Sequence, residues 1–192
     1  MKIGAVVLAA GPSTRMGRPK LLLTHKGMPL LRRAVDAAAE AGCADVVVVL
    51  GANADQYRPL LDGTSVRIVI NEHYGEGMSG SIQLGIEALE DDVEAAVIML
   101  ADQPFIDAEI IRTLIETYRT SGKKIVVCQY GDVRGVPALF DRALFLELLL
   151  VTGDQGARTV METYPGHVAV FEIPAAAAED IDTPDDLEHL NR

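Results

Sequence analysis

Cysteine is scarce in this sequence, and its two cysteines stand far apart. Cys43 and Cys128 lie in apolar surroundings, with no Cys-x-x-Cys pair and no cluster of Cys with His. A disulfide framework or a structural zinc site needs such groupings, so neither is expected. We expect two buried free thiols in a reducing cytoplasm.

Positive charge is also in short supply. The chain has 17 Lys and Arg against 28 Asp and Glu, a net charge of −11. Nucleic acids and anionic membranes are bound by broad positive surfaces, so we expect neither as a partner. No stretch approaches the ~20 apolar residues of a membrane span. The apolar run Ile3–Ala10 mimics a short signal peptide, but no Ala-x-Ala cleavage pattern follows it, so secretion is not expected.

The chain is rich in apolar residues, and their spacing is typical of strands that alternate with helices. It is 192 residues long and 49% hydrophobic, which fits one domain spanning 1–192. The apolar runs predict strands at Ile3–Ala9, Val46–Leu50, Val66–Ile70, Ala95–Ala101, Ile125–Cys128, Val136–Phe140 and His167–Ile173. The helical spacings predict helices at Pro29–Ala41, Met78–Leu89, Asp107–Tyr118, 141–150, 154–163 and Pro184–Asn191.

This alternation indicates an α/β fold, a Rossmann-like three-layer sandwich with a mostly parallel sheet. Ligands of such folds bind outside the carboxyl ends of the strands. The loops 10–20 and 71–80 and the residue Asp102 each follow a predicted strand. We therefore expect them to share one edge of the sheet.

The loop after the first strand has the composition of an anion site. The segment reads Leu8-Ala9-Ala10-Gly11-Pro12-Ser13-Thr14-Arg15-Met16-Gly17-Arg18-Pro19-Lys20. Small residues let backbone N–H groups approach an anion, and Arg15 and Lys20 supply charge. Residues 1–35 carry seven cations and no acid, although a short segment can lack acids by chance. An ordinary strand-to-loop turn with solvated cations is the alternative interpretation.

This segment resembles the nucleotide-binding loop of the MobA-like nucleotidyltransferases, through the pattern LAAGxSxRMGxPK. It is most similar to the molybdenum-cofactor cytidylyltransferase branch. The resemblance implies that the backbone of Leu8, Ala9, Ala10 and Gly11 contacts base and ribose, with Ser13 in the same motif. It further implies that Arg15 and Lys20 bind the triphosphate and neutralise charge as pyrophosphate leaves.

Five further segments are similar to that branch, in the same order along the chain. They are Glu76-Gly77-Met78-Ser79-Gly80-Ser81, Ala101-Asp102-Gln103-Pro104, Arg134-Gly135-Val136-Pro137, Gly153-Asp154-Gln155-Gly156-Ala157-Arg158 and Asp180-Ile181-Asp182-Thr183-Pro184. Two of them depart from the pattern, since Gly80 stands where many members have Ser and Val136 replaces a polar residue. The resemblance thus covers nearly the whole chain and implies the fold of nucleotide-diphospho-sugar transferases.

The activity that this resemblance implies is transfer of CMP from CTP to the phosphate of molybdopterin or molybdenum cofactor, with Mg²⁺ as cofactor. An apo-molybdoenzyme is a further partner that it suggests. Ala10 is the residue that resembles CTP users, because GTP users typically have Gly there. One methyl group is typically worth only ~1–3 kcal/mol of discrimination.

Two aspartates are candidates for the metal. Asp102 ends a buried strand, and Mg²⁺ takes one or two protein carboxylates beside phosphates and water. A surface turn at Asp-x-Pro would explain Asp102 equally well. Only the family pattern pairs Asp102 with Asp182, and Asp180 is an alternative second ligand. Thr183 and Pro184 already have an explanation as the start of a helix.

Three uncharged polar residues complete the expected nucleotide site. The amide of Asn71 could read the edge of a base, as the matching position in the family implies. Ser79 and Ser81 lie at an expected helix start and could bind the nucleotide or acceptor, or could simply cap the helix.

Other functions fit parts of the sequence. Gly75-x-Gly77-x-x-Gly80 is a literal dinucleotide-binding pattern, but its first Gly lies five residues beyond the strand that ends at Ile70, so an oxidoreductase is disfavoured. GTP, or a sugar phosphate or other phosphorylated acceptor, remains open. A non-catalytic chaperone that binds molybdenum cofactor also remains open, since fold does not fix function.

Overall fold

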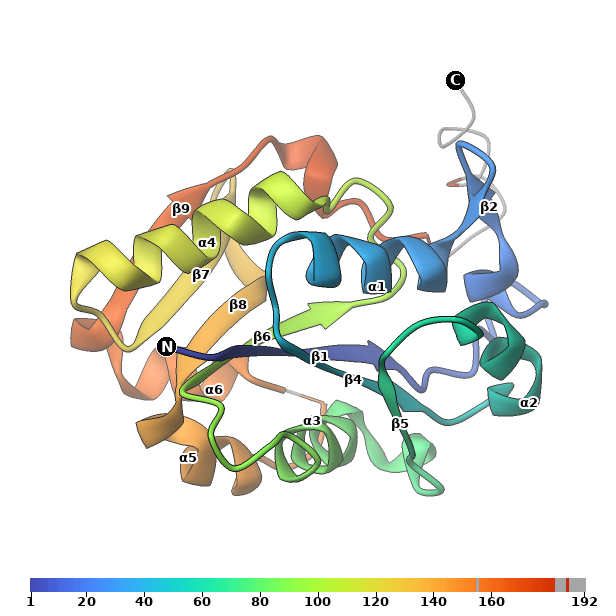
Figure 1. Ribbon diagram of the computed structural model, residues 1–192, viewed down its shortest axis with the longest axis horizontal. Helices are drawn as coiled ribbons and strands as arrows, with labels where there is room; N and C mark the ends of the chain where they lie inside the picture. The colour runs from blue at the N-terminus through green and yellow to red at the C-terminus, as the bar shows by residue number, and fades with distance from the viewer. Residues whose placement is uncertain (155, 182–185, 187–192) are drawn as a thin grey trace.

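The computed structural model describes residues 1–154, 156–181 and 186, and it has a seven-stranded sheet between two layers of helices (Figure 1). The strands are β1 (Ile3–Ala9), β4 (Asp45–Leu50), β5 (Arg67–Ile70), β6 (Ala95–Leu100), β7 (Ile125–Tyr130), β8 (Val133–Asp141) and β9 (Val168–Glu172). Their order is β5-β4-β1-β6-β8-β7-β9. All paired neighbours in this sheet run parallel, except that β8 is antiparallel to β6 and β7. The predicted α/β architecture is confirmed.

The helices lie on both faces of the sheet. They are α1 (Leu30–Glu40), α2 (Ala54–Tyr57), α3 (Met78–Glu87), α4 (Ala108–Ser121), α5 (Phe145–Leu149) and α6 (Arg158–Thr163). Helices α1 and α4 cover one face, and α3, α5 and α6 cover the other (Figure 1). Short 3-10 turns lie at Lys20–Leu22, Arg58–Leu61, Tyr74–Glu76, Arg142–Leu144, Pro165–His167 and Ala175–Ala178.

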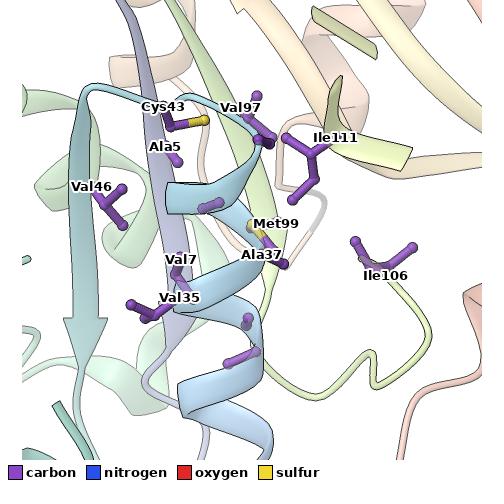
Figure 2. Packing of buried hydrophobic residues seen from close by; sticks show 14 of the residues in the cluster. Ala5, Val7, Val35, Ala37, Cys43, Val46, Val97, Met99, Ile106 and Ile111 are labelled. Atoms are coloured by element: carbon purple, nitrogen blue, oxygen red, sulfur yellow. The ribbon is translucent and has the colours of Figure 1, made fainter. Parts of the chain in front are cut away.

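The core consists of two apolar layers, because the central strands are buried on both faces. Figure 2 shows the layer on the α1 side, where Val35 of α1 lies near Val7 of β1 and Ala37 of α1 lies near Met99 of β6. On the other face Gly85 of α3 packs so close to β1 that a Cβ there would lie 2.2 Å from a methyl carbon of Val6. This close packing fixes α3, and with it the loop that precedes α3, against the central strand.

Several element boundaries differ from the sequence expectation for local reasons. The helix expected over 154–163 begins only at Arg158, since Gly153 and Gly156 adopt positive φ angles of 69° and 55°, which an α-helix does not allow. Pro29 precedes α1 as its cap and also pairs in a small hairpin formed by β2 (Thr24–His25) and β3 (Met28–Pro29). The helix expected at Pro184–Asn191 lies outside the described residues apart from Asp186.

Candidate active site

The carboxyl ends of β1, β4 and β6 lie side by side and carry the loops that the sequence singles out. The backbone N–H of Ala101, just after β6, donates to Leu8 O of β1 at 3.1 Å. The N–H of Ala52, just after β4, donates to Ala10 O at 3.1 Å. The N–H of Asn71, just after β5, donates to Leu50 O of β4 at 2.7 Å. The expectation that the loops 10–20 and 71–80 and Asp102 share one edge of the sheet is confirmed.

Residues 10–20, which we call the cation loop, are held in shape by their own backbone and by Ser13. Ser13 has a left-handed φ of 56°, and its carbonyl accepts from Met16 N at 3.2 Å. The Ser13 hydroxyl accepts a hydrogen bond from Lys20 N at 3.3 Å. Ser13 therefore ties the beginning of the cation loop to its end, which positions Lys20.

Lys20 and Asp102 form the charged centre of this edge. The Lys20 ammonium makes an ion pair with Oδ2 of Asp102, and the two side chains are 13% and 16% exposed. Two opposite charges that are largely withdrawn from water attract each other more strongly than a surface pair does. Arg15 and Arg18 in the same loop are exposed. The edge thus presents cations and one carboxylate together, which suits a phosphate-bearing ligand with a divalent ion.

A segment from the C-terminal part of the protein lies beside Asp102. Ile181 N donates to Asp102 O at 3.1 Å, which brings the segment at 180–181 next to the charged centre. Asp180 is exposed and lies near Tyr130: burial is the largest reason that the pKa of Tyr130 rises to about 12, and the negative charge of Asp180 adds to it. Asp182, the expected second metal ligand, lies outside the described residues.

The donor set fits a divalent ion of the magnesium type. Mg²⁺ takes one or two protein carboxylates and fills its shell with phosphate oxygens and water. Asp102 supplies one carboxylate at the edge where the cations also gather. Within residues 1–154, 156–181 and 186 there is no group of three or more His, Cys, Asp or Glu that could hold a metal by itself.

A polar rim borders the charged centre, formed by Asn71, Gly77, Ser81 and Gly153. Asn71 is 2% exposed and directs its amide inward. Its Nδ2 donates to Ser81 Oγ at 2.9 Å, and its Oδ1 accepts from His73 N at 2.9 Å. The predicted base contact of Asn71 stays a prediction, but in this structure the amide joins the loop after β5 to α3.

The two serines of α3 do not cap the helix. Gly77 occupies the N-cap position, and no side chain caps it. Ser79 and Ser81 lie within the first turn, are buried, and Ser79 N donates to Gly153 O at 3.1 Å. The capping alternative is therefore wrong, whereas their role toward a ligand stays a prediction.

The rim is closed by contacts that the sequence did not reveal. A Cβ on Gly77 would lie 2.7 Å from the carbonyl carbon of Gly153 and 2.8 Å from Oδ1 of Asp154, so the two loops touch directly. Gln83 of α3 donates its Nε2 to Leu149 O at 3.0 Å and to Val151 O at 2.9 Å. The sequence does not predict these two hydrogen bonds, because a single polar residue inside a helix has no distinctive pattern. They hold in place the chain that leads to Gly153.

Ala10 also packs inward. A Cβ on Gly51 would lie 2.9 Å from Cβ of Ala10 and 2.9 Å from Cβ of Tyr74, so these three residues meet at the base of the cation loop. The Ala10 side chain, 6% exposed, thus helps to set the distance between the cation loop and the loop that carries Asn71 and Tyr74.

The thiols do not serve this edge as nucleophiles. Burial raises the pKa of Cys43 and of Cys128 to about 12 in each case. Both side chains are therefore neutral near pH 7, and a neutral thiol is a poor nucleophile. The predicted buried free thiols are confirmed.

In the part of the chain that the structure describes, no helix has the length and apolarity to cross a membrane.

Comparisons with known proteins agree on one family. A family model described as the MobA-like NTP transferase domain matches residues 5–168. Nicotine blue oxidoreductase of Paenarthrobacter nicotinovorans is 31% identical over 198 residues, which cover 98% of this chain and 96% of that protein.

Solved structures support the same grouping. Rv0371c from Mycobacterium tuberculosis H37Rv superposes with a TM-score of 0.88 at 30% identity, covering 99% of this chain and 97% of that one. A second structure of Rv0371c, in complex with manganese, gives a TM-score of 0.79. A nucleotidyl transferase from Methanothermobacter thermautotroptrophicus, 24% identical over 100% of this chain and 98% of its own, shares the fold with a TM-score of 0.82.

Proposed function

Because the chain belongs to the MobA-like NTP transferase family, we propose that it is a Mg²⁺-dependent nucleotidyltransferase acting on a small phosphorylated acceptor. We propose CTP as the donor, molybdopterin or molybdenum cofactor as the acceptor, and one domain spanning 1–192. Family membership by itself supports an enzyme of the nucleotidyltransferase type. The observation that carries the proposal is the Lys20–Asp102 pair, which joins the cation loop to the carboxylate after β6.

The proposed reaction is an in-line displacement at the α-phosphorus of the nucleotide. An oxygen of the acceptor's phosphate forms the new P–O bond, and the bond to the β-phosphate breaks with its electron pair leaving on pyrophosphate. A phosphate monoester has a second pKa of about 6, so it is mostly dianionic near pH 7 and needs no general base. The residues have only to position the reactants and to neutralise charge.

Each side chain of the charged centre has a distinct part in this proposal. Lys20, held by the Ser13 hydroxyl, and the exposed Arg15 bind phosphate oxygens and offset the charge that develops on pyrophosphate. Asp102 would hold the metal together with the phosphates, and Asp182 or Asp180 would add a second carboxylate. The bound metal would supply charge neutralisation at the α- and β-phosphates. The manganese complex of the 30% identical Rv0371c supports a divalent ion.

The choice of CTP rests on Ala10. Its side chain packs against Gly51 and Tyr74, so it influences the spacing of the two loops that border the nucleotide. A change from Ala to Gly at this position would remove a methyl group between the two loops and let them approach each other, which would alter the space for the base. GTP therefore stays in the test as the alternative donor.

A second candidate function comes from one relative. The protein named nicotine blue oxidoreductase matches 98% of this chain, so oxidation or reduction of a small molecule is the second candidate. The Lys20–Asp102 pair favours nucleotidyl transfer, because hydride transfer from NADH or NADPH needs no divalent metal and therefore no metal-binding carboxylate beside the phosphates. The non-catalytic chaperone is the remaining alternative.

One experiment separates these functions. Pyrophosphate release is measured with freshly prepared molybdopterin or molybdenum cofactor and Mg²⁺, with CTP, GTP, ATP or UTP in separate reactions. Parallel samples contain NADH or NADPH with nicotine blue, and absorbance follows the oxidation of the nucleotide. Release that requires CTP, pterin and Mg²⁺ supports the proposal, and release with GTP alone corrects the donor. Absence of release from folded protein, with or without redox turnover, rejects nucleotidyl transfer to this acceptor.

A further inference from the structure

A groove with a cavity volume of about 450 Å³ lies between α6 and the hairpin of β7 and β8. This volume falls within the ~300–1,000 Å³ that small-molecule sites occupy. Its apolar floor includes Val127 and Met161, and its charged rim consists of Asp132, Arg134, Arg158 and Glu162. We call it the hairpin groove. None of these residues takes part in the charged centre or in the rim.

One end of the hairpin groove lies at the edge of the sheet that carries Asp102, because its lining includes the turn after β7. Strands β6 and β7 are each antiparallel to β8, so they point the same way, and their carboxyl ends share one edge. Only β8 separates them, which places β7 roughly 10 Å from β6 in the sheet. The turn that carries Asp132 follows β7 at this edge, just as Asp102 follows β6.

The opposite wall of the groove is also continuous with the active-site edge. Helix α6 begins at Arg158, directly after the loop that packs against Gly77 and accepts the hydrogen bond of Ser79 N at Gly153 O. A ligand in the groove would therefore contact one wall that leads to the rim and another that leads to the carboxyl end of β7.

The charges of the groove favour a particular ligand chemistry. Arg158 Nε is paired with Glu162 at 2.9 Å. Arg134 donates its Nε to Gln129 Oε1 at 3.2 Å and makes no ion pair with any described residue. Its guanidinium is exposed at the hairpin and is the charge best placed for a ligand carbonyl or anion. The carboxylates of Asp132 and Glu162 can accept hydrogen bonds from ring N–H and amino groups.

We propose that the hairpin groove binds the ring portion of the acceptor, a flat amino-substituted heterocycle of the pterin class, with Arg134 as its specificity-determining cation. This assignment rests on the proposed function for the direction of transfer. The apolar floor receives the face of the ring, and Arg134 binds its carbonyl or anionic oxygen. The acceptor's phosphate then reaches along the edge toward Lys20 and Asp102.

A second cavity of similar size does not fit this ligand. It measures about 500 Å³ and lies between α4 and the end of β9 on the opposite face, lined in part by Phe105 and Phe171. The charged residues that line it are Asp107, Glu109 and Glu172, all acidic. A phosphorylated acceptor would be repelled there, so the positive charge of Arg134 favours the hairpin groove over this second cavity.

The test compares Arg134→Gln with Arg119→Gln, a matched change of an exposed arginine on α4 at the opposite face of the sheet. Binding of the fluorescent anion pterin-6-carboxylate is measured by anisotropy, and the KM values for molybdopterin and for CTP are measured by pyrophosphate release. We expect Arg134→Gln to weaken pterin binding and raise the KM for molybdopterin by about tenfold, because a charge-assisted hydrogen bond is lost. The KM for CTP and all values of Arg119→Gln should match the wild type.

Each other outcome counts against the proposal in a defined way. If Arg134→Gln binds the pterin and uses molybdopterin as the wild type does, the groove assignment is wrong while nucleotidyl transfer stands. If the wild-type protein turns over CTP but does not bind the pterin, the ring lies elsewhere. If no nucleotide is turned over, the proposed function fails, and the anisotropy of the two variants still decides whether the groove holds a pterin.

Discussion

The charged centre and the polar rim lie on the same edge of the sheet but are constructed differently. Lys20 and Asp102 keep 13% and 16% of their side chains exposed and are paired ion to ion. Asn71 and Ser81 are 2% and 4% exposed and are hydrogen-bonded within the protein. The first pair is therefore partly accessible from solvent, whereas the second is almost completely enclosed. The charged centre is therefore accessible to a ligand, whereas the hydrogen bonds of the polar rim hold its loops in position.

This difference predicts two separate kinds of defect. Changes in the charged centre should lower turnover far more than the free energy of unfolding, because both side chains keep some contact with water, which can solvate the group that loses its partner. Changes in the rim should lower the free energy of unfolding first and turnover as a consequence, because buried polar groups lose their partners. The distinction would be wrong if a variant of the charged centre lost mainly stability, or if a variant of the rim lost turnover at unchanged stability.

The largest effect is expected from Asp102→Ala. We predict a loss of roughly 10²–10³-fold or more in the rate of pyrophosphate release, since a group that stabilises transferring charge is removed. The melting temperature should stay near that of wild type, because the backbone bond from Ile181 to Asp102 O does not need the carboxylate. Asp91→Ala, an exposed aspartate before β6, is the control and should keep both values. Turnover at the wild-type rate would show that Asp102 does not hold the metal.

A smaller but broader effect is expected from Gly77→Ala. The residue has a φ of 112°, and its new Cβ would meet the backbone of Gly153 at 2.7 Å. We predict a loss of about 1–3 kcal/mol in the free energy of unfolding, measured in urea, together with slower pyrophosphate release. Gly75→Ala has nothing within 4 Å of its new Cβ and is the matched control. Equal free energies of unfolding of the two variants would mean that the loops at Gly77 and Gly153 are not in close contact.

The smallest effect is expected from the Asn71–Ser81 hydrogen bond taken alone. Single variants Asn71→Ala and Ser81→Ala and the double variant form a cycle in urea unfolding. We predict a coupling energy of about 0.5–1.5 kcal/mol, the range of a buried neutral hydrogen bond. Additive losses would indicate that the amide serves the ligand rather than the loop.

Much of the fold could be predicted because its signals are local and strong. The continuous apolar runs gave β1 its observed limits of Ile3–Ala9 and located every other strand of the large sheet to within a few residues. Asp107, where the predicted helix 107–118 begins, caps α4 by accepting hydrogen bonds from Glu109 N and Ile110 N. The β2–β3 hairpin was missed, because strands of two residues carry no periodicity.

The site could be predicted in part only, because contacts between distant residues leave no trace in spacing. The shared edge followed from strand order, so Lys20 and Asp102 could be expected as neighbours but not as an ion pair. The serines of α3 were ambiguous, since Gly77 rather than a serine occupies the cap. The ties of Gln83 to Leu149 and Val151 depend on how α3 meets the chain after α5, which a single sequence does not encode locally.

The hydrogen bond from Ile181 to Asp102 has a consequence for how the protein is made. Translation delivers residues in order, and strand β6 with Asp102 leaves the ribosome long before residue 181 does. A nascent or truncated chain therefore has the cation loop and its aspartate without the segment that packs beside them. Synthesis must pass residue 181 before this contact can form, so the order of translation delays completion of the site until most of the chain exists.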